Sequence, residues 1–294
     1  MTSSTHIDMS VIGHVTKDIT NGQTLVGGAA YYTGMTTTRL GMKTGLLTRC
    51  NPELGTNIAR NFYFYMNLRS TINTSFENTY FNGKRNQVLK SLANPIEVHD
   101  IPKEMLDSSV VVFAPVAHEI DPELIFSFPN SLLAISLQGW LRTWDTSGQV
   151  SALNWSNHID IEKAMFLFLS TEDLLDGLIP LSWLRSNKIV IVTEGTEGSL
   201  LFAKGVWYRV PAFSGIQGDP TGAGDVFVGA YLVRYLEIED PIKAALFASC
   251  AASFKTEAKG ENGIPTREEI ECRLEDQSYK IVIQSKCPKL NYIL

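Results

Sequence analysis

The hydrophobic positions of the chain fall into two alternating patterns, short continuous apolar runs and segments with helical spacing. Continuous apolar runs of this kind predict strands that are buried on both faces of a sheet. Strands that alternate with helices predict a mostly parallel sheet with helices on both sides. We therefore expect a three-layer α/β/α domain. The runs span residues 9–13, 44–48, 109–114, 132–137, 164–170 and 188–193.

Residues that commonly begin helices separate several of these runs. Asp-Pro pairs at 121–122 and 240–241 place a capping carboxylate before a proline at the first helical position. Thr266 and Glu269 have the spacing of a capping box. A further helix is expected over about residues 171–180, with the proline at its end stopping or bending it.

Two segments depart from the alternation of strands and helices, because each places Asn-Gly between strand-like runs. The segments 18–26 and 78–89 carry the pattern, which favours tight β-hairpins. Both lie in the first third of the chain. We therefore expect a small β-rich flap, built from about residues 14–26 and 72–98, on a single domain over 1–294. The alternative from the pattern alone is two surface hairpins with no common role.

Composition narrows the classes of protein. The 294 residues are 44% hydrophobic and 19% charged. The formal net charge of −6 argues against nucleic acid or an anionic membrane as the main partner, although a local basic patch is compatible with it. The cysteines are far apart and the histidines form no closely spaced pair, so neither a disulfide framework nor a zinc site is expected. With no signal-peptide core, and apolar runs such as 110–117 too short to span a bilayer, we expect a cytoplasmic protein.

The stretch GDPTGAGDVFVGAYL (218–232) carries the candidate chemistry. Gly222, Ala223 and Gly224 precede Asp225, and apolar residues at helical spacing follow, so a helix is expected to begin near Ala223. The first amides of a helix lack intrahelical partners and lie at the positive end of its dipole, where they hold anions such as phosphate. A carboxylate here fits a base that takes a proton from a hydroxyl attacking the phosphate. The alternative is that Asp225 only complements the helix dipole beside a tight glycine turn.

The same residues carry a family resemblance. The segment DPTGAGD (219–225) resembles the C-terminal signature of the ribokinase-like (PfkB) family of small-molecule kinases. Further segments resemble motifs of that family in the same order, so the resemblance covers nearly the whole chain. They are VIGHVTKD (11–18), GGAAYYTGMTTTRLG (27–41), TEGTEGSLLF (193–202) and ASCAASFKTEAKG (248–260).

The resemblance implies a ribokinase-like fold and transfer of the γ-phosphoryl group of ATP to a hydroxyl group, with Mg²⁺. It implies that Asp225 is the catalytic base and that the amides of Gly222, Ala223 and Gly224 form an anion hole. It also makes the flap a β lid, which excludes water from the site and so suppresses ATP hydrolysis.

For the acceptor, the resemblance implies a pocket lined by Asp18, Gly27 and Gly28. Tyr31 and Tyr32 occupy a region where ribokinases often have an asparagine, which argues against ribose as the substrate. The alternative for the two tyrosines is ordinary helix packing.

Two other segments resemble stretches of a branch that contains plant-type inositol 3-kinases and bacterial sugar-kinase relatives. Gln138 and Arg142 lie just after a predicted strand, at the edge where open α/β sheets bind ligands, so we assign them to substrate binding. The alternative for Arg142 is a surface ion pair with Asp145 or Glu172. Asn78 and Arg85 of the lid are weaker candidates, because alternate strand positions face solvent. The two segments span 74–87 and 138–150.

The resemblance places the donor nucleotide against the second half of the chain. The family's Asn-x-x-Glu motif appears here as STED (170–173), so Glu172 and Asp173 are expected to hold Mg²⁺ through water. Ser249 stands where many members have an asparagine near adenine, which leaves the nucleotide preference open. The implied donor-binding residues are Ser170, Thr193, Gly195, Gly198, Thr221, Gly222, Gly224 and Ser249.

Resemblance alone is the basis for a monovalent cation such as K⁺ as a further cofactor. Carbonyl groups near Asp219, Thr221 and Gly260 would hold this ion. Relatives of this kind include lid-mediated dimers, and an exposed lid edge favours pairing with a second chain, so the chain is expected to be a monomer or a lid-mediated homodimer.

The leading expectation is an ATP-dependent kinase that acts on a sugar or cyclitol hydroxyl, with myo-inositol as one candidate acceptor. A nucleoside kinase of the same family is the alternative within this class, because the same scaffold accepts both kinds of substrate. From a different class, the alternative is a catalytically silent ligand-binding relative, which the retention of Asp225 after GAG opposes.

Overall fold

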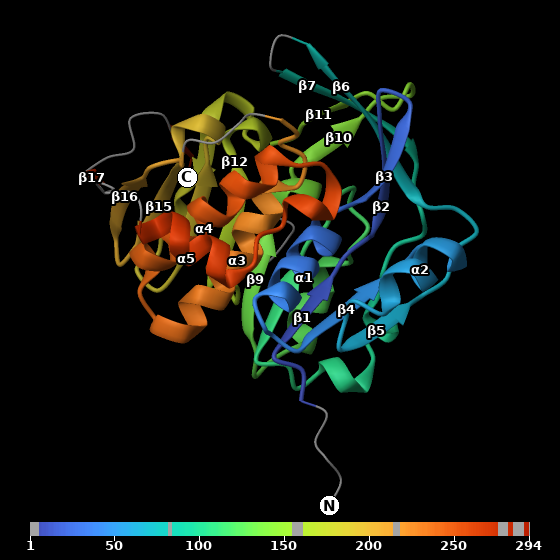
Figure 1. Ribbon diagram of the computed structural model, residues 1–294, viewed down its shortest axis with the longest axis horizontal. Coiled ribbons are helices and arrows are strands. Elements are labelled where there is room, and N and C mark those ends of the chain that lie inside the picture. The colour runs from blue at the N-terminus through green and yellow to red at the C-terminus, as the bar shows by residue number, and fades with distance from the viewer. Residues whose placement is uncertain are drawn as a thin grey trace, which may run out of the picture.

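A ten-stranded, twisted sheet forms the centre of the molecule (Figure 1). The computed structural model describes residues 6–81, 84–154, 161–213, 218–275, 282–284 and 291–293. In spatial order, the strands are β17 (Val282–Gln284), β16 (Val206–Val210), β15 (Ser199–Ala203), β14 (Ile189–Thr193), β12 (Phe166–Ser170), β9 (Leu132–Ser136), β8 (Val110–Phe113), β1 (Met9–Ile12), β4 (Thr44–Thr48) and β5 (Phe64–Asn67). The strands from β14 to β5 pair in parallel, and β15, β16 and β17 add antiparallel pairs at one edge.

Each apolar run of the sequence forms a parallel strand of this sheet, so the predicted fold class is confirmed. Successive residues of a strand point to opposite faces. In β8, Val110 and Val112 enter the hydrophobic core on one face, and Val111 and Phe113 enter the core on the other. A strand that contributes to two cores must be apolar at every position, which is why the runs lack polar alternation.

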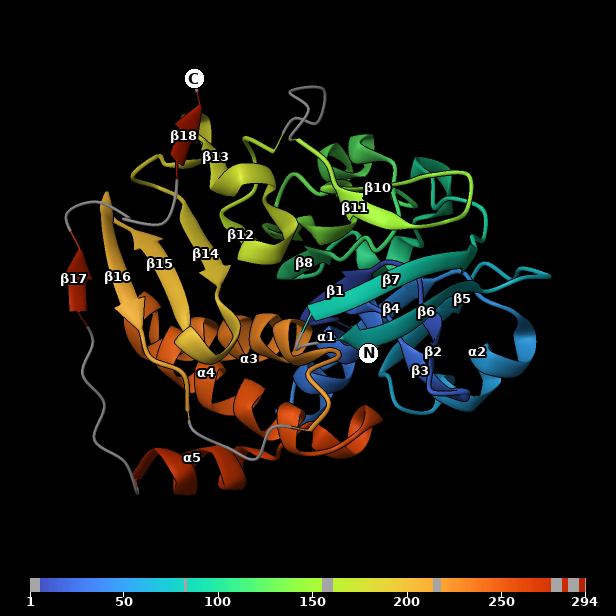
Figure 2. The same ribbon diagram turned by 90° about the horizontal axis from the view of Figure 1, so that it is seen from above.

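The α-helices of the described chain cover one face of the sheet, and turns with short 3₁₀ helices cover most of the other (Figure 2). We expected helices on both faces of the sheet. Regular α-helices cover one face only, and the helices on the other face are short 3₁₀ helices. No helix of the described residues is long and apolar enough to cross a membrane. The helices are α1 (Ala29–Arg39), α2 (Pro52–Ala59), α3 (Ala223–Ile238), α4 (Pro241–Glu257) and α5 (Arg267–Glu275).

The predicted helix starts are correct where a carboxylate or hydroxyl reaches the first free amides. Asp240 accepts hydrogen bonds from the amides at 242 and 243 and begins α4. Thr266 and Glu269 bond each other's backbone amides and begin α5. Asp121 also caps as predicted, but the segment it begins, Pro122–Ser127, is a 3₁₀ helix.

The helix predicted over 171–180 is wrong. The chain forms short 3₁₀ turns there, followed by strand β13 (Leu178–Pro180), which pairs with β18 (Asn291–Ile293). Asp176 and Gly177 have φ values of 54° and 65°, which a right-handed helix cannot contain.

The two predicted hairpins lie side by side in a second sheet, separate from the large one. Its strand order is β3-β2-β6-β7, with β2 and β6 pairing in parallel. In the first hairpin, Asn21 and Gly22 both have positive φ, as a type I′ turn requires. The second Asn-Gly pair lies outside the described residues. The strands are β2 (Thr16–Thr20), β3 (Gln23–Gly27), β6 (Thr74–Phe81) and β7 (Lys84–Ser91). The function of this small sheet as a lid stays a prediction.

A third hairpin fastens this small sheet to the body. Strands β10 (Arg142–Trp144) and β11 (Val150–Ala152) are joined by a turn whose Gly148 carbonyl accepts a 2.8 Å hydrogen bond from the Leu89 amide. Gly148 has φ of +83°, and a Cβ there would lie 2.3 Å from the Leu89 carbonyl oxygen. Glycine is therefore required where this turn meets β7.

Candidate active site

Helix α3 begins in a tight turn that leaves some of its first amides open. Gly222 precedes the helix with φ of +86°, and a Cβ there would lie 2.6 Å from the ring of Tyr32. A Cβ on Gly224 would meet nothing within 4 Å. The ring therefore packs under the turn at Gly222, while Gly224 faces open space that an anion could fill.

One hydrogen bond within the turn reduces the number of amides available in the predicted anion hole. The amide of Ala223 donates to the Pro220 carbonyl at 3.0 Å, so it is already used within the turn. The amides of Gly222 and Gly224 donate no hydrogen bond to any residue that the structure describes. These two amides, rather than all three, are available to a phosphate.

The packing of α1 against α3 fixes Asp225. The Thr33 hydroxyl donates to the backbone carbonyl of Asp225 at 3.2 Å. One turn further along α3, a Cβ on Gly229 would lie 2.9 Å from the Thr33 carbonyl oxygen. Because Gly229 lets the two helices approach so closely, the first turn of α3 is held against α1, which itself begins directly after Gly28.

Asp18 lies against the glycines that precede α1. Its Oδ1 accepts a 2.8 Å hydrogen bond from the Thr16 hydroxyl. A Cβ on Gly27 would lie 2.2 Å from the Asp18 Oδ2 atom, so only glycine leaves room for this carboxylate. Gly28 has φ of +98°, and a Cβ there would lie 2.5 Å from the His14 carbonyl oxygen.

Arg142 is buried, with 7% of its surface exposed, so the alternative of a surface ion pair with Asp145 or Glu172 is wrong. Its guanidinium lies 4.0 Å from the Asp173 carboxylate, whose side chain is also buried. Asp145 instead accepts hydrogen bonds within its own turn, and Glu172 is exposed. Gln138, the other residue predicted after β9, is partly buried in the 3₁₀ helix Leu137–Trp140.

The charged side chains from these separate elements share one electrostatic environment. Burial raises the pKa of Asp225 to about 7, opposed by Arg142 and Arg85 and reinforced by Asp18 and Asp173. Burial likewise raises the pKa of Asp18 to about 6, with Arg85 and Arg142 opposing it. The structure therefore brings the predicted base, the predicted acceptor carboxylate and two arginines close enough to perturb one another.

Asn78 of the small sheet adds an unsatisfied polar group. The residue is fully buried, and its Oδ1 accepts a 2.8 Å hydrogen bond from Gln87. Its Nδ2 has no hydrogen-bond partner among the described residues. A buried amide donor of this kind is costly unless a ligand satisfies it.

The predicted donor-side residues follow the ends of β12 and β14. Ser170 and Thr193 are neighbours in the register of these two strands. Gly195 has open space where a Cβ would stand, whereas a Cβ on Gly198 would lie 2.1 Å from the Val210 carbonyl oxygen. Ser249 is buried in α4 and donates a 2.7 Å hydrogen bond to the Pro211 carbonyl, so its hydroxyl is used within the fold.

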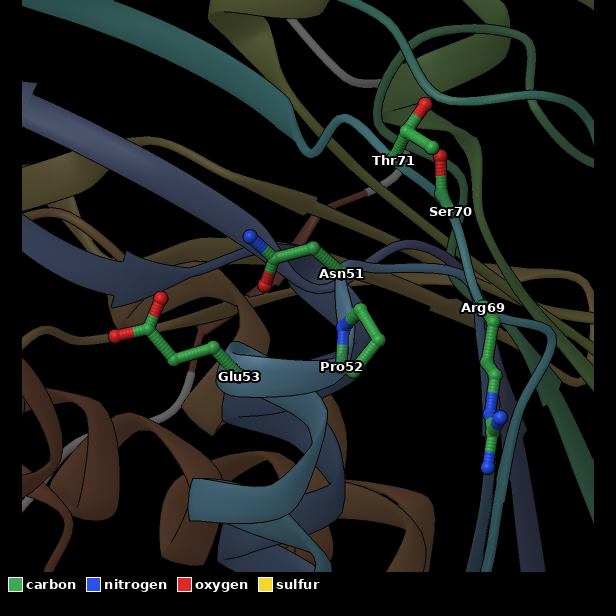
Figure 3. Close-up of a pocket in the computed structure, with 6 residues that line it drawn as sticks. All are labelled: Asn51, Pro52, Glu53, Arg69, Ser70 and Thr71. Atoms are coloured by element: carbon green, nitrogen blue, oxygen red, sulfur yellow. The ribbon is translucent and has the colours of Figure 1, made fainter.

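A hollow of about 490 Å³ opens elsewhere, at the start of α2 (Figure 3). It contains none of the predicted site residues. Asn51 caps α2 there by accepting a hydrogen bond from Leu54, and Arg69 extends away from Glu53 (Figure 3). Its lining residues are Asn51, Pro52, Glu53, Arg69, Ser70 and Thr71. These side chains do not converge on a common point, so we place the candidate chemistry at Asp225.

Comparison with known proteins agrees with this fold. The family described as pfkB family carbohydrate kinase matches residues 158–267. A sulfate complex of a pyrophosphate-dependent kinase in the ribokinase family superposes with a TM-score of 0.74 at 25% identity, covering 90% of this chain and 99% of that one. Residues 158–267 are therefore similar to the pfkB family of carbohydrate kinases. The similarity of the chain to the nucleoside kinase of Methanocaldococcus jannaschii, with a TM-score of 0.72 at 20% identity, shows the shared fold.

Curated relatives match the chain over part of their own length. The nucleoside kinase of Methanocaldococcus jannaschii is 34% identical over 123 residues, which cover 39% of this chain and 40% of that protein. Inositol 3-kinase of Arabidopsis thaliana is 30% identical over 188 residues, which cover 61% of this chain and 52% of that protein. The chain therefore spans about half of these relatives or less.

The two carboxylates expected to hold Mg²⁺ differ in how far other residues already occupy them. One oxygen of Asp173 accepts the Ser170 amide at 2.9 Å, and the other faces Arg142. The described residues contain no group of three His, Cys, Asp or Glu side chains placed to bind a metal. Glu172 is exposed beside Asp173 and fits a site that holds Mg²⁺ through water. The assignment of Glu172 and Asp173 to Mg²⁺ stays a prediction.

Sequence reasoning missed one charged residue beside the site. Lys255 of α4 is fully buried, and its ammonium donates to the Ala258 carbonyl at 2.9 Å and to the Asp219 carbonyl at 3.4 Å. The available signal was a single lysine within the apolar stretch ASCAASFK of a helix. A buried lysine needs partners, so such a position deserves inspection.

Proposed function

We propose that this chain is a kinase that transfers the γ-phosphoryl group of ATP to a hydroxyl of a sugar or cyclitol. The observation that carries the proposal is the Asp225 carboxylate, with its raised pKa, at the start of α3 beside open amides. A base whose pKa lies near neutrality accepts a proton well and is still ionised at working pH. Asp18 and Arg142 of the same cluster supply an acceptor and a donor of hydrogen bonds for the substrate.

In the proposed reaction, Asp225 takes the proton from the acceptor hydroxyl. The oxygen then forms a bond to the γ-phosphorus, and the bond between that phosphorus and the bridging oxygen of the β-phosphate breaks to release ADP. The amides of Gly222 and Gly224 stabilise the charge on the transferred group. Mg²⁺, when bound near Glu172 through water, neutralises phosphate charge. The small sheet, acting as a lid, excludes water that would compete with the hydroxyl.

A cyclitol is the acceptor class that best suits the polar groups of the proposed acceptor site. Asp18, Arg142 and the unsatisfied Asn78 amide offer polar groups of both kinds, which suits a ring that carries hydroxyls on all sides. Inositol 3-kinase of Arabidopsis thaliana is similar over 61% of the chain. We therefore place myo-inositol first among the acceptors and a nucleoside second.

Pyrophosphate is a second candidate donor. The solved structure at 25% identity is that of a pyrophosphate-dependent kinase. The amides at the start of α3 would bind phosphate, a group that ATP and pyrophosphate share. The Ser249 hydroxyl, next to the expected adenine position, is already bonded to the Pro211 carbonyl.

A panel of acceptors and donors tests the proposal. Myo-inositol, hexoses, pentoses and nucleosides are each incubated with ATP or with pyrophosphate, and phosphorylated product is detected by mass. We expect product from myo-inositol or another polyol with ATP. Turnover of nucleosides alone would make the chain a nucleoside kinase, and turnover with pyrophosphate alone would replace the donor. No product from any pair would favour the silent ligand-binding alternative.

The pH dependence of turnover follows from the raised pKa of Asp225. A base must be deprotonated to accept a proton, so kcat/KM should fall as the pH drops through about 7. Protonation of Asp18, with a pKa of about 6, should steepen this fall at lower pH. The measurement is kcat/KM for the best acceptor across the acidic and neutral range in buffers of constant ionic strength. A rate that stays level well below pH 6 would rule out Asp225 as the base.

Replacing Gly224 with alanine should separate stability from activity. Alanine within a helix is more stable than glycine by about 0.5–1 kcal/mol, and the new Cβ meets no protein atom within 4 Å. The methyl group would occupy the space proposed for the phosphate, so kcat/KM should fall by about tenfold or more. We expect a raised Tm together with lower activity, measured on the same preparation. Unchanged activity would exclude a phosphate from this position.

A further inference from the structure

Lys255 is a buried cation that the proposed reaction does not use. Its side chain has no exposed surface, and it lies in the last turns of α4, where the helix dipole favours positive charge. The packing around it is close, since a Cβ on Gly263 would lie 3.0 Å from the Lys255 side chain. A phosphate donor could not reach this ammonium without displacing the protein around it.

The ammonium of Lys255 joins the end of α4 to the turn that precedes α3. It donates to the carbonyl of Ala258, just after α4, and to that of Asp219, at the start of DPTGAGD. The amide of Asp219 in turn donates to the Thr256 carbonyl at 3.1 Å. Asp219 is therefore held in place through hydrogen bonds of both its backbone amide and its backbone carbonyl.

The same ammonium also supports the floor of the anion hole. It lies 5.6 Å from the centre of the Tyr32 ring, within the range of a cation–π contact. That ring packs directly under Gly222, whose amide is one of the two proposed to bind the phosphate. Lys255 thus contacts both the segment that leads into the turn, at Asp219, and the aromatic ring beneath the turn.

This arrangement disagrees with the monovalent cation expected from the sequence. The carbonyl of Asp219, one of the groups assigned to that ion, is within hydrogen-bonding distance of the Lys255 ammonium. Two positive charges would compete for one carbonyl, so the residues present do not fit an added K⁺ ion there. Burial lowers the pKa of Lys255, while Asp219 and Asp225 favour its charged form.

We propose that Lys255 is a built-in cation that positions the anion hole in place of a bound monovalent ion. For its effect on catalysis the proposal rests on the proposed kinase function. Lys255 is a positioning residue, because it acts through the Asp219 carbonyl and the Tyr32 ring. The proposal predicts a kinase that is indifferent to K⁺, and a Lys255→Ala variant that acquires a dependence on it.

The test compares the wild type with two variants in choline, sodium, potassium and ammonium chloride at equal ionic strength. Lys255→Ala leaves space for an ion, whereas Lys255→Met fills that space with an uncharged chain of similar length. We expect the wild type to show the same Tm and kcat/KM in every salt. In choline, Lys255→Ala should lose about 10- to 100-fold in kcat/KM and have a lower Tm, because two carbonyls lose a charged donor. Potassium or ammonium should restore both quantities in Lys255→Ala and neither in Lys255→Met.

Lys188 provides the matched control. It is also buried and donates to the carbonyls of Ile161, Glu162 and Ala164, remote in sequence from the α3 turn. Lys188→Met should lower the Tm and leave kcat/KM of the folded enzyme unchanged. Activation of the wild type by K⁺ over choline would overturn the proposal, as would a Lys255→Ala variant that no cation restores. If Lys255→Ala does not fold, the wild-type salt series decides. The Tm comparison needs no turnover, so failure of the kinase assignment would leave this test intact.

Discussion

Replacing Asp225 with asparagine is expected to lower kcat by about 10²- to 10⁴-fold while the donor still binds, since this is the usual contribution of a general base. Asparagine keeps the shape of the side chain and loses its basicity. The bond from Thr33 reaches the backbone carbonyl of Asp225, so the substitution leaves that anchor of α3 in place. Single-turnover rates with the best acceptor measure the chemical step, and calorimetric titration of the donor measures its binding. Turnover within about threefold of the wild type would make Asp225 a structural residue.

The Tm of Asp225→Asn, measured against pH, serves as the control for misfolding. Because burial raises the folded-state pKa of Asp225 to about 7, the charged form is the unfavourable one in the native protein. The stability contributed by the neutral form is complete below the ordinary carboxyl pKa and is lost as the pH rises through 7. Asparagine does not suffer this loss, so Asp225→Asn should have a higher Tm than the wild type above pH 7 and a smaller difference at acidic pH. An inactive variant with a lowered Tm throughout would point to a damaged fold instead.

Replacing Asp18 with alanine should weaken acceptor binding and spare the donor. A carboxylate accepts charge-assisted hydrogen bonds from neighbouring hydroxyls, and each such bond is worth about 1.5–3 kcal/mol, or roughly 10- to 150-fold in affinity. The donor motifs lie on other elements, so the affinity for ATP should change little. Separate titrations of acceptor and donor measure the two effects. Unchanged acceptor affinity with a lowered Tm would leave Asp18 as a residue of the first hairpin only.

Gly27→Ala is the matched variant for this prediction. It leaves the Asp18 carboxylate in the sequence but places a Cβ 2.2 Å from its Oδ2 atom, so the carboxylate must move. Gly27→Ala should therefore reproduce the acceptor defect of Asp18→Ala without removing the charge. Normal acceptor affinity in Gly27→Ala would show that the position of the carboxylate is unimportant.

The sequence was sufficient for features that depend on neighbours along the chain. The buried strands and the start of α3 are local, since an apolar run or a small residue before an amphipathic segment carries the signal itself. The helix over 171–180 failed because a positive φ at Asp176 is set by its surroundings. The Asp-Pro pair at Asp121 predicted the start of a helix but not its type, because such a cap can begin a 3₁₀ helix as well as an α-helix.

Features that depend on distant contacts could not be predicted in this way. The buried Arg142 faces the Asp173 carboxylate, and strands β11 and β12 lie between these two residues along the chain. The role of Lys255 depends on two carbonyls and a ring from three different segments. A single sequence gives the residue types of such a cluster, but only the fold places them together.

The turn at Gly148 has a consequence for association between molecules. It occupies the outer side of β7 around Leu89, and Gln149 adds side-chain hydrogen bonds to Asn86 and to the Gln87 carbonyl. The Leu89 amide and the Gln87 carbonyl on that edge are therefore already bonded within the chain, which interrupts the free edge of β7. An intermolecular sheet needs a continuous free edge, and the other edge strand of the small sheet is β3. Two copies joined through their small sheets would have to pair β3 with β3, in an antiparallel arrangement about a two-fold axis.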